Sequence, residues 1–392
     1  MRRFTMVLAA ACLLVGASTF AATGVAAASG PLTITADRAA AIPAGHDWGF
    51  NDFFPRTVSV HSGATIQFSI QGFHTATLMP AGVSATAARV SIGLVKADGD
   101  DTTPNLNGSP HLLENLVAAF PMPGGCGSSG HPCAFNGTAP VSSGAPVSGP
   151  LPVFNVKVTA PVGFYRFLCL IHPNMNGWLA VVPSAFPTTT KAELATKVHA
   201  QVLRDRHEGF VAEAAANVAH SRSNGDGTRT WIATAGTSSP DGHVAINEML
   251  PHRISIHRGD KVTWVSRAVN EPHTVTFPKD LGTEMVPLCE NGATDTLATP
   301  TVIPPTGPQD FTCGGPPVEV EFGGGNGVNH VTSRSTVSDS GIIASKAELA
   351  GFGLPSTAAS AKWTVSFSGA HRTTYRFVCQ IHDGMAGVIA VH

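Results

Sequence analysis

The chain carries one set of potential metal-binding side chains twice. Residues 165–177 and residues 375–387 both follow the pattern Tyr-Arg-Phe-x-Cys-x-Ile-His-x-x-Met-x-Gly. The Cys, His and Met of the two copies are Cys169, His172 and Met175, and Cys379, His382 and Met385. A thiolate, an imidazole and a thioether at three-residue intervals let one short turn present three ligands to the same ion. The repetition makes a chance match a poor explanation.

A second imidazole completes the set in each half. His74 lies in GFHTATL and His273 lies in EPHTVTF, so each is followed by Thr in a matching context. One thiolate and two imidazoles with a long axial thioether form the donor set of a type 1 (blue) copper site, which suits both oxidation states of copper. Zinc fits this set poorly, because structural zinc sites use more Cys and His ligands. We therefore predict two copper ions. The predicted ligands are His74, Cys169, His172 and Met175 in the first half, and His273, Cys379, His382 and Met385 in the second.

The repeat extends to the elements that must position these side chains. FNDFFPRTVSVHSGATIQF (50–68) aligns with INEMLPHRISIHRGDKVTW (246–264). Segments of alternating polarity between Gly and Pro turns predict short strands, and such strands in series favour a Greek-key β-sandwich. The predicted strands are Arg56–Val60, Thr65–Ile70, Val153–Val158, Phe164–Cys169 and Trp178–Val182, then Arg253–Ile256, Lys261–Val265, Trp363–Phe367, Tyr375–Cys379 and Val388–Val391.

Length and composition agree with an all-β protein of two tandem sandwiches joined by a helical linker. The chain has 392 residues, only 13% of them charged, with 41 Gly and 29 Pro. We predict a signal peptide over 1–28, a first domain over 29–184, a linker over 185–228 and a second domain over 229–392. The linker contains one helical stretch, Lys191–His220, whose N-cap lies within Thr188–Thr190. Its apolar residues recur at four-residue spacing, which favours a packed connector over a partner-binding helix.

Long insertions, roughly 80–150 and 279–360, separate the first His from the Cys in each half. We expect loops there, with a short helix near His111–Ala119. Each insertion contains two Cys, and four Cys allow three pairings. The economical pairing is local, Cys126 with Cys133 and Cys289 with Cys313, as befits an exported protein.

The first residues predict export. Arg2 and Arg3 precede an apolar stretch, and Ala26–Ala28 is a suitable cleavage site before Ser29. The expected location is secreted or extracytoplasmic, periplasmic or cell-surface, without stable membrane insertion after cleavage. An uncleaved membrane anchor is the alternative. A formal charge of −2 without a basic cluster predicts no nucleic-acid partner.

On the hairpin, the first His and the final ligand loop, each half resembles the cupredoxins, the plastocyanin- and azurin-type blue-copper domains. The Cys-x-x-His-x-x-Met spacing is most similar to amicyanin. The resemblance does not cover the insertions or the helix. It implies that the eight residues above are the ligands of two type 1 sites. It also implies that the loop His, His172 or His382, lies near a hydrophobic surface where electrons usually enter. Thr75 and Thr274 stand where several cupredoxins have an Asn that braces the Cys loop.

Enzymes containing such domains are disfavoured by two features of the sequence. Oxidases need several His-x-His pairs for a trinuclear cluster, and the sequence has none. Copper oxidases and nitrite reductases usually place a His directly after the type 1 Cys, where this chain has Leu170 and Gln380. We therefore expect a secreted electron carrier, not an enzyme, whose redox partner protein the sequence leaves open. The alternatives are a copper-binding or storage protein without a dedicated redox partner, a structural or partner-binding protein, and, least favoured, a copper oxidoreductase.

Overall fold

The computed structural model describes residues 30–92, 95–97, 112–115, 125–144, 153–278, 285–289, 296–297, 319–322, 327–357, 359–369, 372–382 and 384–392. Residues Pro31–His392 form one compact unit. The predicted signal peptide, 1–28, lies outside the described residues. Among those that are described, no helix is long and apolar enough to cross a membrane.

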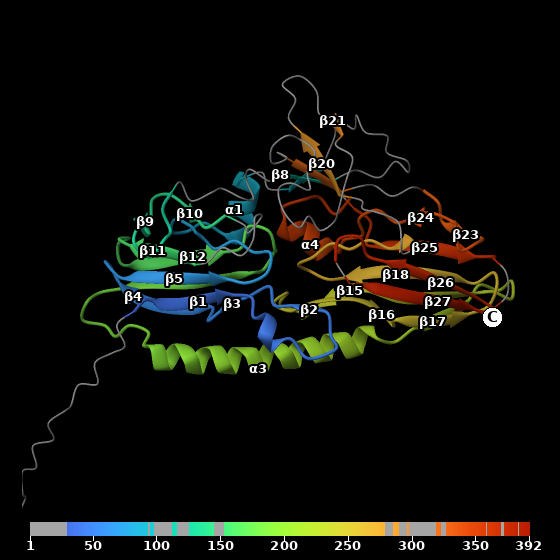
Figure 1. Ribbon diagram of the computed structural model, residues 1–392, viewed down its shortest axis with the longest axis horizontal. Coiled ribbons are helices and arrows are strands. Elements are labelled where there is room, and N and C mark those ends of the chain that lie inside the picture. The colour runs from blue at the N-terminus through green and yellow to red at the C-terminus, as the bar shows by residue number, and fades with distance from the viewer. Residues whose placement is uncertain are drawn as a thin grey trace, which may run out of the picture. The chain divides into compact units, whose positions relative to one another are not determined.

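The first half folds into two facing five-stranded sheets (Figure 1). One sheet has the order β3 (Phe53–Phe54), β1 (Leu32–Ala36), β5 (Thr65–Ile70), β11 (Phe154–Val158) and β9 (Cys133–Phe135). The other has the order β10 (Val141–Ser142), β6 (Thr77–Leu78), β12 (Gly163–Leu168), β13 (Asn176–Val182) and β4 (Thr57–His61). Alternate side chains point inward, so Phe68 and Phe167 from opposite sheets meet in the core with ring centroids 5.5 Å apart.

The second half repeats this architecture. Its larger sheet has the order β2 (Trp48–Gly49), β16 (Ala245–Leu250), β15 (Arg229–Ser238), β18 (Lys261–Arg267), β25 (Lys362–Phe367) and β23 (His330–Val331), and β14 (His220–Ser223) pairs with β15. The facing sheet has the order β17 (Arg253–Ile256), β27 (Ala386–Val391), β26 (Thr373–Val378), β19 (Thr276–Phe277) and β24 (Ser338–Asp339). Trp264 and Phe377 meet between the sheets, 5.1 Å apart.

The same parallel pairings recur in both halves. β1 runs parallel to β5 as β15 runs parallel to β18, and β13 runs parallel to β4 as β27 runs parallel to β17. The predicted all-β, two-sandwich fold is therefore confirmed. The predicted division at residues 184 and 228 stays a prediction, since β2 of the first half pairs with β16 of the second.

Parts of the two insertions form a further sheet of the order β21 (Thr296–Leu297), β20 (Met285–Cys289), β22 (Glu319–Phe322), β8 (Leu112–Asn115) and β7 (Val95–Ala97). The helix expected near His111–Ala119 is wrong over residues 112–115, because these residues pair antiparallel with β22. The predicted Cys126–Cys133 disulfide is present. The Cys289–Cys313 pairing lies outside the described residues. Two short helices, α1 (Ala85–Ile92) and α4 (Lys346–Gly351), precede the ligand loops in their halves.

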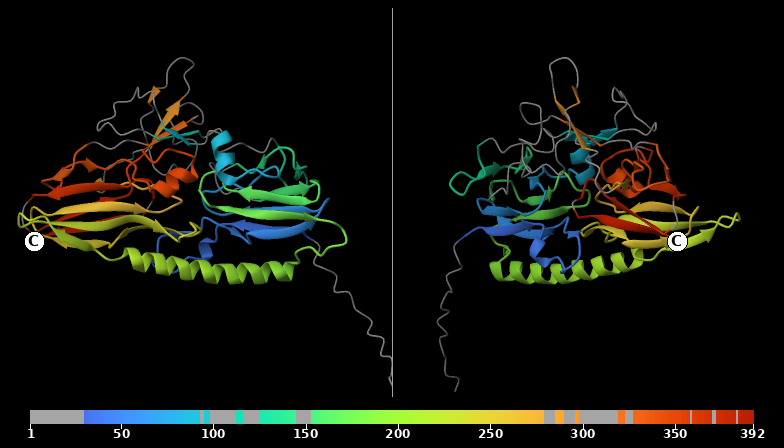
Figure 2. Two further views of the ribbon diagram at one scale, coloured as in Figure 1. Left: turned by 180° about the vertical axis from the view of Figure 1, so that it is seen from behind. Right: turned by 45° about the vertical axis from the view of Figure 1, so that its right-hand side comes forward.

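The helix predicted over Lys191–His220 is α3 (Lys191–Ala216), and it begins at a capping box made by Thr190 and Glu193. It ends earlier than predicted, at Ala216, because His220 is already the first residue of β14. Leu194 packs on the core of the first sandwich, while Val198 and Val202 pack on a cluster that combines residues of β2 and β16. The helix thus contacts both halves, as the two views in Figure 2 show. This agrees with the packed connector expected from its spacing.

Candidate metal centre

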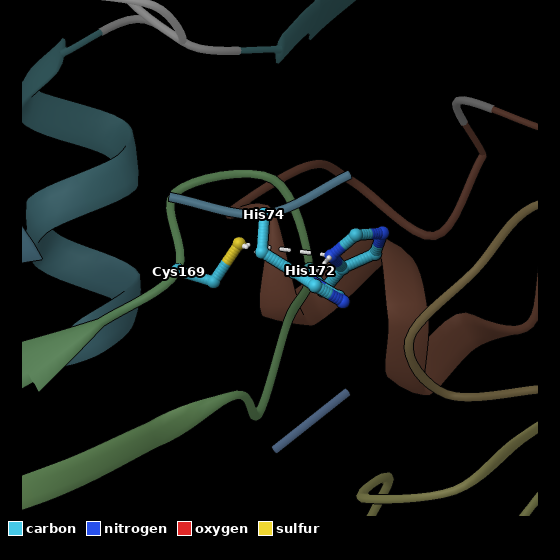
Figure 3. Close-up of side chains that lie close together, drawn as sticks. All are labelled: His74, Cys169 and His172. Atoms are coloured by element: carbon cyan, nitrogen blue, oxygen red, sulfur yellow. Dashed lines mark hydrogen bonds between the residues drawn. The ribbon is translucent and has the colours of Figure 1, made fainter. Parts of the chain in front are cut away.

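The first predicted site forms where the β12–β13 loop meets the segment that follows β5. Figure 3 shows His74, Cys169 and His172 turned toward one another. The Sγ of Cys169 lies 3.9 Å from the Nδ1 of His74 and 3.6 Å from the Nδ1 of His172. The two Nδ1 atoms are 3.0 Å apart. Three donor atoms of the types expected for one ion therefore converge.

The site is enclosed by the sandwich core. Cys169 and Met175 are fully buried, and both belong to the core cluster that contains Phe167. The loop closes on itself, because the N–H of Cys169 donates to the carbonyl of Met175 at 3.0 Å. Burial alone would raise the pKa of Cys169, but His172 and His74 hold that pKa well below its usual range. The side chain therefore favours the thiolate that a copper ion requires.

The second site repeats the first. The Sγ of Cys379 lies 3.6 Å from the Nδ1 of His382, and the donor atoms of His273, Cys379 and His382 all lie within 4.8 Å of one another. Met385 is buried, and the carbonyl of Met385 accepts from the N–H of Cys379 at 2.9 Å. Burial opposes thiolate formation here too, yet His273 and His382 hold the pKa of Cys379 well below its usual range.

His273 gives the strongest sign that an ion belongs in this place. Its side chain is fully buried, and neither ring nitrogen has a hydrogen-bond partner within the described structure. Burial lowers the pKa of His273, although the Cys379 thiolate opposes this effect. A buried neutral imidazole with a free nitrogen beside a thiolate fits a copper ion, since an unmatched buried polar atom otherwise costs free energy.

A threonine braces each Cys loop. The N–H of Thr75 points at the Sγ of Cys169 at 3.4 Å, and the Thr75 Oγ1 accepts from the N–H of Leu170 at 2.8 Å. Thr274 makes the same two contacts, 3.4 Å to the Sγ of Cys379 and 2.8 Å from the N–H of Gln380. The hydroxyl thus hydrogen-bonds at the position that several cupredoxins give to Asn.

Two groups that sequence reasoning missed support the first site. The buried guanidinium of Arg89, on α1, donates to the carbonyls of Cys169 at 2.6 Å and His172 at 2.7 Å, and to that of Leu170 at 3.3 Å. Burial lowers the pKa of Arg89 to about 10, so the side chain stays charged at neutral pH. An Arg in the otherwise small and apolar stretch ATAARVSI was the available signal.

Asp37 is the other missed group. Its Oδ2 lies 3.8 Å from the Nε2 of His74. Burial alone would lower the pKa of His74, but Asp37 and Cys169 raise it to about 10. In the second half Gly236 corresponds to Asp37. Thr35 pairs with Ser69 and Thr234 pairs with Val265, the counterpart of Ser69. Asp37 and Gly236 each follow two residues after these threonines.

A third missed group, Glu271, lies between the two ligand loops. Its Oε2 contacts the Nε2 of His382, and its Oε1 lies 3.6 Å from the Nε2 of His172. Burial opposes ionisation, but the charges of His382 and His172 keep the pKa of Glu271 below its usual range. The resemblance implies that the loop imidazoles, His172 and His382, lie near a hydrophobic surface. Their Nε2 atoms instead face one carboxylate, that of Glu271. The signal was that Glu271 stands two residues before His273, where the first half has Gly72 before His74.

One further group of potential ligands lies apart from both sites. The Nδ1 of His46 is 2.7 Å from an oxygen of Glu213 and 3.8 Å from one of Glu248. His46 lies outside both repeated motifs, and no sequence pattern links it to these two carboxylates. The oxygens already accept from the Trp48 indole at 3.2 Å and the Asp47 N–H at 2.9 Å, which accounts for the cluster without an ion.

Comparisons with known proteins give the following likenesses. No model of a known protein family matches the chain, and no curated protein sequence matches it. Among solved structures, the dithionite-reduced auracyanin from the photosynthetic bacterium Roseiflexus castenholzii is 16% identical with a TM-score of 0.22, covering 39% of this chain and 97% of its own. A copper-containing nitrite reductase from Thermus scotoductus is 12% identical with a TM-score of 0.18, covering 86% of this chain and 59% of its own. A multicopper oxidase is 10% identical with a TM-score of 0.20, covering 92% and 88%. Likenesses with scores this low do not indicate a function for this chain.

Proposed function

We propose that this chain is an electron-transfer protein that holds one type 1 copper ion in each of its two sandwiches. The observation that carries the proposal is the convergence of one buried cysteine sulfur with two imidazole nitrogens in each half, within 4.8 Å. In the first half the ligands would be His74, Cys169, His172 and Met175. In the second half they would be His273, Cys379, His382 and Met385.

Copper in such a donor set would supply a one-electron couple without bond making. The chain's own residues would supply rigidity. Each Cys loop is tied to the sandwich by a Thr hydroxyl and a Thr N–H, so the sulfur stays in place when the charge of the site changes. Apolar neighbours such as Phe167 and Phe377 exclude water from the thiolates. A site that cannot rearrange costs little reorganisation on electron transfer.

The proposal extends to the setting of the protein. The N-terminal sequence supports export, so we place the mature chain outside the cytoplasm, where a redox partner protein would exchange electrons with it. We propose a carrier without catalysis. The support is the apolar Leu170 and the amide Gln380 beside the two cysteines, where copper enzymes usually have a His that leads to a catalytic copper.

The decisive experiment is a Cu(II) titration of the mature protein followed by visible absorption, with Cys169→Ala and Cys379→Ala as matched single-site variants. We expect an intense thiolate band that saturates at two coppers, halves in each variant and disappears in the double variant. Absence of a blue band from the wild-type protein would contradict the proposal.

A second measurement separates a carrier from the other candidate functions. Stopped-flow reduction of the blue protein by ascorbate and reoxidation by ferricyanide should both be fast and should leave copper bound. Slow reduction with loss of copper would favour storage. Steady consumption of oxygen or nitrite, absent from the Cys169→Ala, Cys379→Ala double variant, would favour a copper oxidoreductase.

A further inference from the structure

One carboxylate lies between the two candidate metal centres and contacts both. Glu271 accepts from the Nε2 of His382 through Oε2, and its Oε1 lies 3.6 Å from the Nε2 of His172. The Nδ2 of Asn51 donates to Oε1 at 2.8 Å and fixes the carboxylate from the first half of the chain. Glu271 is only 8% exposed, so little water competes for these contacts.

Both loop imidazoles are oriented in the same way around this carboxylate. His172 and His382 each direct Nδ1 to the Sγ of their own cysteine, at 3.6 Å in both cases. Each directs Nε2 to Glu271. The carboxylate therefore favours a hydrogen on Nε2 and leaves Nδ1 as the nitrogen available to a metal, as outer acceptors do for ligating histidines. A continuous chain of contacts runs from Cys169 through His172, Glu271 and His382 to Cys379.

The ligand loop of the first half is held against the second half. The Nδ2 of Asn174 donates to the carbonyl of Val269 at 3.2 Å. Pro173 lies close to Gly351: a Cβ added at residue 351 would be 2.6 Å from the Cβ of Pro173. These contacts flank His172 and keep it facing Glu271.

The repeat does not supply a second carboxylate equivalent to Glu271. The first half has Gly72 where the second has Glu271, and a Cβ at residue 72 would lie 2.9 Å from the Asp37 carboxylate and 3.3 Å from the His74 ring. A side chain is therefore excluded at that place in the first half. Glu271 therefore contacts a ligand of each centre, but it lies close in sequence only to His273, a ligand of the second centre.

We propose that Glu271 couples the two centres, so that they exchange electrons with each other inside the molecule through His172 and His382. The inference rests on the proposed function. With copper bound, one electron would pass between the centres, both Nε2 protons would stay on their imidazoles, and no bond would be made or broken. An external one-electron donor supplies the first electron. The negative charge of Glu271 stabilises the more positive, oxidised state of both centres.

The test uses the full chain with Glu271→Gln, which keeps the shape and removes the charge. Reduction potentials are measured in the Cys379→Ala background, which retains the first centre, and in the Cys169→Ala background, which retains the second. We expect Glu271→Gln to raise the potential of the remaining centre in both. The matched control is Asp37→Asn, whose carboxylate approaches His74 of the first centre, and it should raise the potential of the first centre alone. An effect of Glu271→Gln confined to one centre would overturn the proposal.

Kinetics test the electron exchange itself. After pulse reduction of the two-copper protein by less than one electron per molecule, redistribution between the centres should be independent of protein concentration. We expect it to be at least tenfold slower in Glu271→Gln. A rate that scales with protein concentration, or that does not change in the variant, would contradict an internal route.

A metal-free measurement keeps this inference separate from the proposed function and from any folding defect of the variant. In the wild-type apoprotein, ¹⁵N NMR should find the Nε2 of both His172 and His382 protonated, with hydrogens that exchange slowly with water. A freely exchanging Nε2 on His172 would remove the bridge even if two blue copper sites form. Lack of a blue band with both Nε2 hydrogens protected would instead reject the copper function and leave the shared carboxylate intact.

Discussion

Gly236 lies directly against His273. A Cβ at residue 236 would be 1.8 Å from the Nε2 of His273, and the glycine has a φ of +69°. The corresponding residue of the first half, Asp37, has a φ of 62° and places its carboxylate near His74. One backbone position thus gives the first centre an acidic neighbour and gives the second a close backbone contact, so the two centres differ although their ligands repeat.

Replacing Gly236 with Ala should disable the second centre. The added methyl group must displace His273, and the left-handed backbone disfavours any side chain, so we expect a loss of about 3 kcal/mol of stability. Metal analysis should fall from two ions to one per chain.

Gly225 provides the matched control for that variant. It also has a positive φ, +85°, but no atom lies within 4 Å of its added Cβ. Gly225→Ala should cost about 1 kcal/mol from backbone strain alone and should keep both ions. Equal metal loss in the two variants would mean that the contact with His273 is unimportant.

The threonine braces should matter equally in both halves. Thr75→Val removes the acceptor of the buried N–H of Leu170, and Thr274→Val removes that of the partly buried N–H of Gln380. Each change should cost about 1–3 kcal/mol. Thr75→Ser and Thr274→Ser keep the hydroxyl and serve as controls. Urea unfolding of the metal-free proteins measures the cost, and each Val variant should shift the thiolate band of its own centre. Valine variants that match their serine controls would show that the hydroxyl does not hold the loop.

The parts of the fold that the sequence predicts are those with local alternation. Thr65–Ile70 and Arg253–Ile256 form strands with the predicted bounds, since polar and apolar residues alternate in both. Arg229–Ser238 was not predicted, because its second half is buried without alternation and its residues are mostly small. Residues 112–115 were expected to be helical and form a strand instead, because pairing with the distant Glu319–Phe322 overrides a local preference.

The same distinction between local and distant interactions applies to the residues of the candidate centres. Cys169, His172 and Met175 are predictable because one turn presents them at a fixed spacing, and the repetition confirms the pattern. Glu271 and Arg89 stand out in their local sequences, but their contacts are not predictable, since each acts only where distant segments meet. Glu271 and His172 are far apart in the sequence, and this separation gives no indication that they lie in contact.

Arg89 should be required for the first centre and not for the second. Arg89→Met removes the donor to the carbonyls of Cys169, Leu170 and His172, so we expect a loss of about 3 kcal/mol and weaker metal binding by the first centre. Arg166 is the control, because its guanidinium interacts with side chains of β13: it stacks on Trp178 at 4.2 Å and donates to the Oδ1 of Asn176. Arg166→Met should cost about 1 kcal/mol or less. The comparison needs denaturation curves and metal titrations in the Cys379→Ala background, and unchanged affinity in Arg89→Met would contradict the assigned role.

Buried carboxylates that hold α3 against the first sandwich should make the stability of the fold depend on pH. Asp205 on α3 and Asp52 share the guanidinium of Arg56, which lies 3.0 Å from Asp205 and 2.7 Å from Asp52. Burial and the charge of Asp52 raise the pKa of Asp205 to about 7, against the attraction of Arg56. Because the folded pKa exceeds the unfolded one, the folded state binds the extra proton between about pH 4 and pH 7. The stability contribution is therefore fully present below about pH 4 and is lost as the pH rises through 7.

Asp205→Asn should remove this dependence, since the amide oxygen still accepts from Arg56 and carries no charge. The wild-type protein should lose on the order of 2 kcal/mol more than the variant between pH 5 and pH 8. Guanidinium chloride unfolding of both metal-free proteins at the two pH values checks this, with Asp226→Asn, an exposed turn residue, as the control for general charge effects. Parallel wild-type and Asp205→Asn profiles would show that Asp205 is ionised throughout and that Arg56 fully compensates the buried pair.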